Sequence, residues 1–139
     1  MTSTPSLPLR AGYLAPLAAF FGALAVALGA FGAHGLKAIL TPEALAWWRT
    51  GSEYQLVHAV AMLAAGLAIH LPHPSPIARP RAVAIAGWLF ALGMLLFAGS
   101  LYLMALTDLR WLGAVTPLGG TAFIAGWLAL ALGLWPTSR

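Results

Sequence analysis

The sequence predicts an all-α integral membrane protein: a four-helix transmembrane bundle with a short interfacial helix between spans one and two. Of its 139 residues, 61% are hydrophobic and only 7% are charged, whereas about 25% of a soluble domain consists of Asp, Glu, Lys and Arg. So few charges cannot cover the surface of a water-soluble fold. Four uncharged stretches are long enough for spans of about 20 residues, and they cover residues 11–36, 54–78, 82–107 and 111–138.

Each uncharged stretch is expected to form a helix, because lipid cannot satisfy exposed backbone amides and no alternating pattern indicates a barrel. We expect one membrane domain with helices near residues 13–34, 42–50 (interfacial), 53–71, 82–106 and 117–135. A cleaved signal peptide is the competing interpretation of the N-terminus, since Arg10 precedes an apolar stretch. That stretch continues to Leu36, beyond the usual length of a signal peptide's apolar region, so a first span is expected instead.

The residues between the first two spans predict the interfacial helix. His34 and Gly35 resemble the last turn and C-cap of the first helix, where glycine tolerates the left-handed conformation. Thr41-Pro42 then resembles an N-cap followed by proline at the first helical position. The pair Trp47-Trp48 suits the membrane interface. We expect this segment to lie along the membrane surface until Gly51 permits a turn into the second span.

Prolines and small residues place the remaining elements. Prolines 72, 74, 76 and 80 predict an extended second loop. Thr116-Pro117 repeats the cap-and-proline signal and predicts the start of the last span. Pairs of small residues four apart predict close contacts between helices; these pairs are Ala18 with Gly22, Ala25 with Gly29, Ala122 with Gly126, and Ala129 with Gly133.

Four alternating spans place the first and third loops at one face of the membrane and the second loop and termini at the other. The second group contains Arg10, Arg79, Arg81 and Arg139, and the first contains Lys37, Arg49 and Arg110. Because Lys and Arg favour the cytoplasmic side, we expect both termini to be cytoplasmic.

The topology gathers the polar side chains of the spans at the end that holds the first and third loops. The candidate polar cluster comprises His34, Lys37, Glu53, Tyr54, His58, Ser100, Tyr102 and Thr116. The opposite half of the bundle is built largely from Ala, Leu, Gly, Val, Ile and Phe. Polar groups are therefore missing from one half of any path across the membrane, which argues against a channel or pump that works alone.

His58 is the most informative single residue, because ionisable side chains inside spans are costly and are often functional. It lies about 7.5 Å deeper along the helix axis than Glu53 and shares a helix face with Tyr54. Two interpretations follow. His58 is either a ligand-binding residue or a neutral side chain that hydrogen-bonds to a backbone carbonyl or a hydroxyl between helices.

A metal site formed by His34, Glu53 and His58 is the sharpest form of the first interpretation, because two His and one carboxylate are typical of catalytic zinc and non-haem iron. However, Glu53 and His58 are about 140° apart around a regular helix, so they do not face one ion. We therefore expect no metal and no cofactor. Glu53 is expected to pair with Lys37 or Arg49 at the interface.

Ordered motifs along the chain resemble a known family. They are Gly29-Ala-Phe-Gly-Ala-His34-Gly-Leu36, then Trp48, Glu53-Tyr54-Gln55 and His58-Ala59, then Gly99-Ser-Leu-Tyr102 and Ala105-Leu-Thr107, and finally Gly113, Thr116-Pro-Leu-Gly-Gly120 and Gly126-Trp127. This order resembles the domain-of-unknown-function family 423, which includes the transmembrane protein 256 group. The resemblance implies a multi-pass protein with four helices and implies no activity. Asp108 departs from the glycine expected after Thr107.

Two main functional hypotheses remain open, and transport through an oligomer is a third, minor one. The first is a non-enzymatic accessory, scaffolding or lipid-interacting bundle whose partners are membrane lipids and either another copy of the chain or another membrane protein. The alternative is a pocket at the polar end for a small molecule, haem, quinone or metal, with a catalytic role in some forms. No nucleic-acid partner is expected, because the basic residues form no run.

Overall fold

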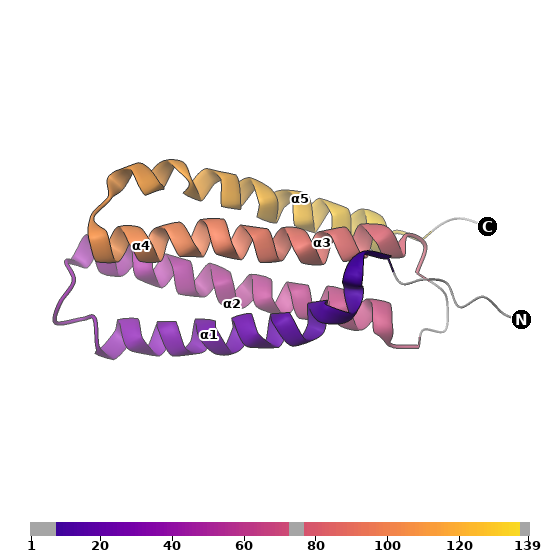
Figure 1. The fold of residues 1–139 in the computed structure, drawn as a ribbon, viewed down its shortest axis with the longest axis horizontal. Coiled ribbons are helices and arrows are strands. Elements are labelled where there is room, and N and C mark those ends of the chain that lie inside the picture. Colours follow the sequence, from indigo (N-terminus) through magenta and orange to yellow (C-terminus); the bar gives the residue numbers. More distant parts are fainter. Residues whose placement is uncertain (1–7, 73–76, 137–139) are drawn as a thin grey trace, which may run out of the picture.

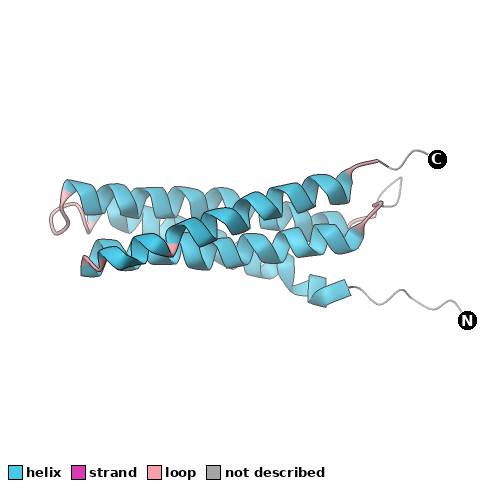
Figure 2. Ribbon diagram, turned by 90° about the horizontal axis from the view of Figure 1, so that it is seen from above, coloured by secondary structure: helices cyan, strands magenta, loops and turns pink. Residues whose placement is uncertain are grey.

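The fold is a bundle of four antiparallel helical columns, and the computed structural model describes residues 8–72 and 77–136 of it (Figure 1). In chain order the elements are η1 (Pro8–Tyr13), α1 (Leu14–His34), α2 (Pro42–His70), α3 (Pro80–Gly93), η2 (Met94–Ala98), α4 (Gly99–Thr107), η3 (Arg110–Ala114) and α5 (Thr116–Leu134). Elements α3, η2 and α4 follow one another without a break and form the third column. The described residues contain helices and loops only, as Figure 2 shows.

Each column is long and apolar enough to cross a membrane. The four candidate spans are Ala11–His34, Pro42–His70, Pro80–Thr107 and Arg110–Leu134. The predicted four-helix transmembrane bundle is therefore confirmed. The first and third loops lie together at one end of the bundle, and the second loop lies at the other (Figure 1).

The structure corrects the separate interfacial helix predicted for residues 42–50. Pro42–His70 is one continuous helix, so these residues form the first turns of α2. Gly51 does not turn the chain; instead it gives room to Tyr102, since a Cβ there would lie 3.0 Å from the Tyr102 ring. Trp48 is only 4% exposed and packs inside the bundle. Packing against α1 and α4 thus keeps the segment aligned with the rest of α2.

The helix ends agree with the sequence signals in part. Thr41 caps α2 as expected, because its Oγ1 accepts a hydrogen bond from the backbone N–H of Ala44 at 3.2 Å. Gly35 is not left-handed: its φ is −70°, and a Cβ there would lie 2.6 Å from the Phe31 ring. Thr116 is not a cap either, because η3 ends just before it and the chain is already helical at Val115.

Asp108 ends α4 in the left-handed conformation, with φ 55° and ψ 20°. Its backbone N–H donates to the carbonyl of Met104 at 2.9 Å, which closes the last turn of the helix. An L-residue is strained in this region, although Asp tolerates it better than most. The position therefore favours glycine, which is the residue that the family resemblance leads one to expect.

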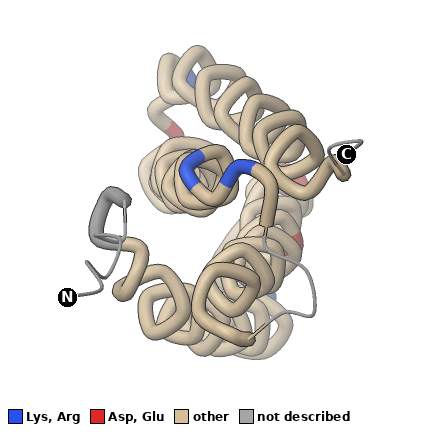
Figure 3. Tube along the Cα trace, turned by 90° about the vertical axis from the view of Figure 1, so that its right-hand side faces the viewer, with Lys and Arg blue, Asp and Glu red and all other residues tan. Residues whose placement is uncertain are grey.

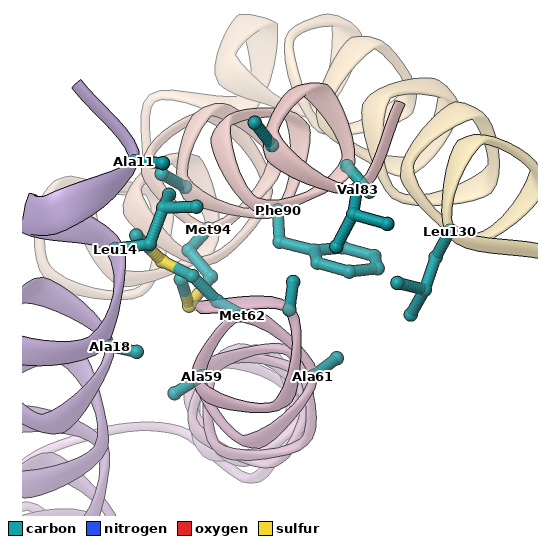
Figure 4. Close-up of a cluster of buried hydrophobic side chains, with 14 of the residues drawn as sticks. Ala11, Leu14, Ala18, Ala59, Ala61, Met62, Val83, Phe90, Met94 and Leu130 are labelled. Atoms are coloured by element: carbon teal, nitrogen blue, oxygen red, sulfur yellow. The ribbon is translucent and has the colours of Figure 1, made fainter. Parts of the chain in front are cut away.

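The inner columns are α2 and the α3–α4 column, whereas α1 and α5 lie on the outside. In the most apolar 18-residue stretch of each span, 44% and 50% of residues are buried in the inner columns, against 17% and 22% in the outer ones. Leu14, Met62, Phe90 and Met94 meet at the centre of the main core (Figure 4). Most of the surface of α1 and α5 therefore faces outward.

Glycines set the closest approaches between columns. Gly126 lies against the ring of Phe90, and a Cβ added there would come within 2.7 Å of that ring. A Cβ at Gly119 would lie 2.4 Å from the backbone nitrogen of Phe97, so α5 touches the main chain of η2 at this point. The small-residue pairs predicted from the sequence thus include contacts within this chain.

The element η2 is a π-helical turn in the middle of the third column. Such turns are rare and are often found near functional residues. Here the wide turn lies where the Phe97 main chain meets Gly119. The sequence contains no signal for it, because residues 94–98 are uniformly apolar.

We expect Gly119→Ala to lower the free energy of unfolding by about 1–3 kcal/mol, because its methyl group would overlap backbone atoms that cannot move away. The neighbouring Gly120→Ala is the matched control. A Cβ at Gly120 meets only the Phe97 ring at 3.9 Å, so this variant should be neutral or more stable by up to about 1 kcal/mol. Circular dichroism during SDS titration of detergent-solubilised protein measures both values. Equal stability of the two variants would contradict the close contact.

Asp108→Gly should be more stable than Asp108→Ala by about 1 kcal/mol, because only glycine adopts the left-handed conformation without strain. Both variants lose the same carboxylate and its exposed contact with Arg110. The difference between their free energies of unfolding therefore reports the backbone strain at residue 108. The same SDS titration measures it. An alanine variant as stable as the glycine variant would show that α4 does not end in this conformation.

Candidate functional site

The eight residues of the predicted polar cluster separate into two groups. Four are exposed at the outside of the bundle: His34, Lys37, Glu53 and Tyr54. The other four are buried or half-buried between helices: His58, Ser100, Tyr102 and Thr116. The expected single cluster is therefore two sets of residues with different surroundings.

His58 lies in a group of aromatic side chains between α2, α3 and α5. Its Nδ1 is 2.7 Å from the carbonyl of Tyr54, one turn earlier on α2. Its Nε2 accepts a hydrogen bond from the indole N–H of Trp127 at 3.2 Å. The imidazole stacks on the Phe123 ring, with centroids 3.5 Å apart.

These contacts define the protonation state of the imidazole. An indole nitrogen can only donate, so Nε2 must be the unprotonated acceptor. Nδ1 then carries the proton and donates it to the Tyr54 carbonyl, which gives a neutral ring. Because both nitrogens have protein partners, His58 has no free position for a ligand. This geometry fits the second interpretation, a hydrogen-bonding contact between helices.

A second polar group joins α1, α2 and α4, and Gln55 is its centre. The side-chain amide of Gln55 donates to the carbonyl of Phe21 at 2.9 Å, and its oxygen accepts from the Tyr102 hydroxyl at 2.9 Å. About two turns away, the indole of Trp48 donates to the carbonyl of Leu28 at 2.8 Å. Two backbone carbonyls of α1 thus gain an additional side-chain donor from α2.

A third contact joins α4 to α5. The hydroxyls of Ser100 and Thr116 are 2.8 Å apart. Ser100 also donates to the carbonyl of Phe97 at 2.9 Å. In the described part of the chain, each buried side-chain nitrogen or oxygen has a hydrogen-bond partner. The polar interior is thus satisfied by the protein itself.

The residues considered for a metal site do not come together. Within residues 8–72 and 77–136, no three His, Asp or Glu side chains lie close enough to share an ion. His34 and Glu53 are exposed, whereas His58 is 5% exposed and hydrogen-bonded on both nitrogens. The donor set of two His and one carboxylate is therefore not assembled here.

The ion pairs at this end differ from those expected. Arg110 contacts Glu43 at 3.2 Å and Asp108 at 3.3 Å, and its guanidinium lies 5.5 Å from the centroid of the Trp47 ring. Among the described residues, Glu53 pairs with neither Lys37 nor Arg49, contrary to the prediction. Two of the three acidic side chains, Glu43 and Asp108, thus gather around Arg110, where the start of α2 meets the third loop.

The opposite end of the bundle has few polar contacts. His70 lies 3.2 Å from the carbonyl of Ala11, and Arg79 donates to the carbonyl of Leu132 at 2.9 Å. Figure 3 looks onto this end and shows basic positions at the start of α3, with the acidic positions at the far end. The charge distribution therefore has one purely basic end among the described residues and one mixed end.

Gln55, Trp48 and Trp127 were not among the predicted cluster residues. Gln55 is 3% exposed, which makes it as buried as the apolar core. A side-chain amide inside a transmembrane helix predicts a hydrogen bond to a neighbouring helix, because the surrounding lipid offers it no partner. The two tryptophans gave a weaker signal, since Trp residues usually mark the membrane interface.

Four apolar spans and an internally satisfied polar interior define a small multi-pass membrane protein. The chain belongs to the family described as "Protein of unknown function (DUF423)", which it matches over residues 28–120.

Three relatives support this assignment. They are a UPF0382 membrane protein of Haemophilus influenzae, 44% identical over 84% of this chain and 89% of its own; the UPF0382 inner membrane protein YgdD of Escherichia coli, 43% identical over 84% of both chains; and the UPF0382 membrane protein YwdK of Bacillus subtilis, 41% identical over 84% of this chain and 90% of its own. No solved structure matches the chain.

We expect Trp127→Phe to lower the free energy of unfolding by about 0.6–1.7 kcal/mol, because it leaves Nε2 of His58 without its donor. The same change in a His58→Phe background should cost less, since the acceptor is already gone. A double-mutant cycle over the SDS titration measures the coupling. A coupling energy of zero would show that the indole and the imidazole do not interact.

Proposed function

We propose that this protein is a non-enzymatic accessory component of the membrane that acts through its outer surface, where it binds lipids. One observation carries the proposal: the buried polar side chains are hydrogen-bonded to other helices or to backbone carbonyls. His58 in particular has both nitrogens occupied. A catalytic or cofactor site needs polar groups that are free to meet a ligand, and the bundle interior offers none among the described residues.

The outer columns favour lipid as the partner. Large apolar side chains cover the outside of α1 and α5; Phe20 is 62% exposed, Ile124 is 65% exposed and Leu128 is 61% exposed. In water such a surface would cause aggregation, but hydrocarbon is its natural solvent. These residues face away from the core, so lipid chains or another membrane protein can reach them.

The small-residue pairs no longer support self-association strongly. Gly126 and Gly133 face α3, where they contact Phe90 and Val83. Gly22 and Gly29 face α2. Because these positions hold the bundle together, they are not available for close packing against a second copy. This difference favours lipids over a second copy of the chain as the proposed partner.

The experiment is purification of the full chain from membranes in a mild detergent, followed by lipid extraction and mass spectrometry. We expect lipids to remain bound after repeated washing, and a partner protein would also be consistent with an accessory role. Isolated monomer without lipid or partner, obtained reproducibly, would refute the proposal.

Membrane orientation can be tested directly, because the chain contains no cysteine. We propose that both termini and the second loop are cytoplasmic, on the basis of the Lys and Arg distribution. An impermeant thiol reagent added to whole cells should then label Ala38→Cys in the first loop and not Ala78→Cys in the second. The reverse pattern would invert the topology, and labelling of both would contradict the four-span arrangement.

A further inference from the structure

A cavity of about 300 Å³ lies between α1 and α2 near the end of the bundle that holds the first loop. Among the residues that line it are Gly29, Gly32, Lys37, Trp48, Arg49 and Ser52. Its volume is at the lower limit for a small-ligand site, which is about 300–1,000 Å³. The cluster around His58 lies between α2, α3 and α5, away from this cavity, whereas Trp48 of the polar group around Gln55 forms part of its wall.

Two glycines of α1 line the cavity. A Cβ at Gly32 would lie 2.4 Å from the Trp48 ring, so the indole occupies the space that a side chain would fill. Gly29 has no side chain to fill the space opposite Ser52. A Cβ built on Gly29 would lie 3.7 Å from the Ser52 hydroxyl oxygen, which is an ordinary contact distance. Ala33, the remaining α1 residue that lines the opening, is small and exposed. The α1 residues that line the cavity therefore have small side chains or none, and the cavity stays open to the outside of the bundle.

The charges around the cavity are both positive. Lys37 and Arg49 line it, and no acidic residue does. In the described part of the chain neither cation forms an ion pair with a carboxylate, and Glu43 and Asp108 both pair with Arg110. Glu53 follows Arg49 by one turn, about 40° further around α2, and lies outside the lining. The cavity is thus suited to an anion.

The depth of the cavity matches lipid headgroups. The first span, Ala11–His34, has 24 residues and is about 36 Å long at 1.5 Å per residue. The hydrocarbon core is only about 30 Å thick, so the last turn of α1 reaches the headgroup layer. Gly32 belongs to this turn, and Lys37 lies just beyond it.

We propose that this cavity binds the phosphate of an anionic phospholipid headgroup, with Lys37 and Arg49 as the cations that contact it. The inference rests on the proposed lipid-binding function and adds the site and the class of lipid. Phosphate oxygens accept hydrogen bonds from Lys and bidentate pairs from Arg. The acyl chains of the bound lipid then lie along the apolar outside of α1, where Val26 is 61% exposed.

The test is native mass spectrometry of the full chain in a neutral detergent, titrated with phosphatidylglycerol, phosphatidylcholine or inorganic phosphate. We expect one tightly bound phosphatidylglycerol per chain and weaker binding of the other two. The double variant Lys37→Gln, Arg49→Gln should weaken phosphatidylglycerol binding by about 10- to 30-fold. Ala33→Leu keeps both charges but narrows the opening, so it should also weaken binding.

Arg110→Gln is the matched control, because it removes one positive charge from the same end of the bundle but outside the cavity. It should leave binding unchanged, and circular dichroism should show each variant folded. Unchanged affinity in the double variant would overturn the site, as would equal weakening by Arg110→Gln, which indicates diffuse charge attraction. Equal binding of phosphatidylcholine would overturn the anionic selectivity, and tight binding of inorganic phosphate alone would overturn the lipid assignment. In each of these cases lipid copurified with the wild type leaves the proposed function standing, whereas isolated monomer without lipid or partner refutes that function.

Discussion

The structure depends on one constraint: a polar group inside hydrocarbon has no water to bond with, so the protein itself must supply its partner. This constraint applies to side chains as well as to the backbone. Gln55 meets it through Phe21 and Tyr102, and His58 meets it through Trp127 and its own helix. Each solution joins two or more columns. The polar side chains thus fix how the helices are aligned, which uniformly apolar surfaces cannot do.

Glycines provide the second condition, because those hydrogen bonds form only between helices that are close together. Gly51 brings α2 against the Tyr102 ring, within reach of Gln55, and Gly119 brings α5 against η2 near the contact between Ser100 and Thr116. Small residues and polar residues therefore act together. This pairing explains why the family resemblance includes both kinds of residue at the same end of the bundle.

Composition and charge spacing were sufficient to predict the four spans, because the cost of placing charges in lipid limits where helices can lie. The continuity of α2 could not be predicted in this way. A glycine beside an interfacial tryptophan fits a bend and a close contact equally well, and only the position of Tyr102 decides between them. Inward and outward faces were also ambiguous: His58 is 5% exposed and Tyr54 is 46% exposed, although they lie one turn apart. The packing of the neighbouring helices determines this difference in exposure, and the sequence of α2 alone carries no information about that packing.

The distribution of charge follows from the same arrangement and connects the fold to its surface. The first and third loops meet at one end, so Glu43 and Asp108 come within reach of a single arginine, Arg110. Within the described residues Lys37 and Arg49 form no ion pair, and both line the cavity between α1 and α2. The buried polar side chains of the described residues have partners within the protein, and the basic cavity lies near the end of the bundle that holds the first loop. Both observations support the proposal that this protein acts where the bundle meets the lipid, with the inside of the bundle holding that surface in place.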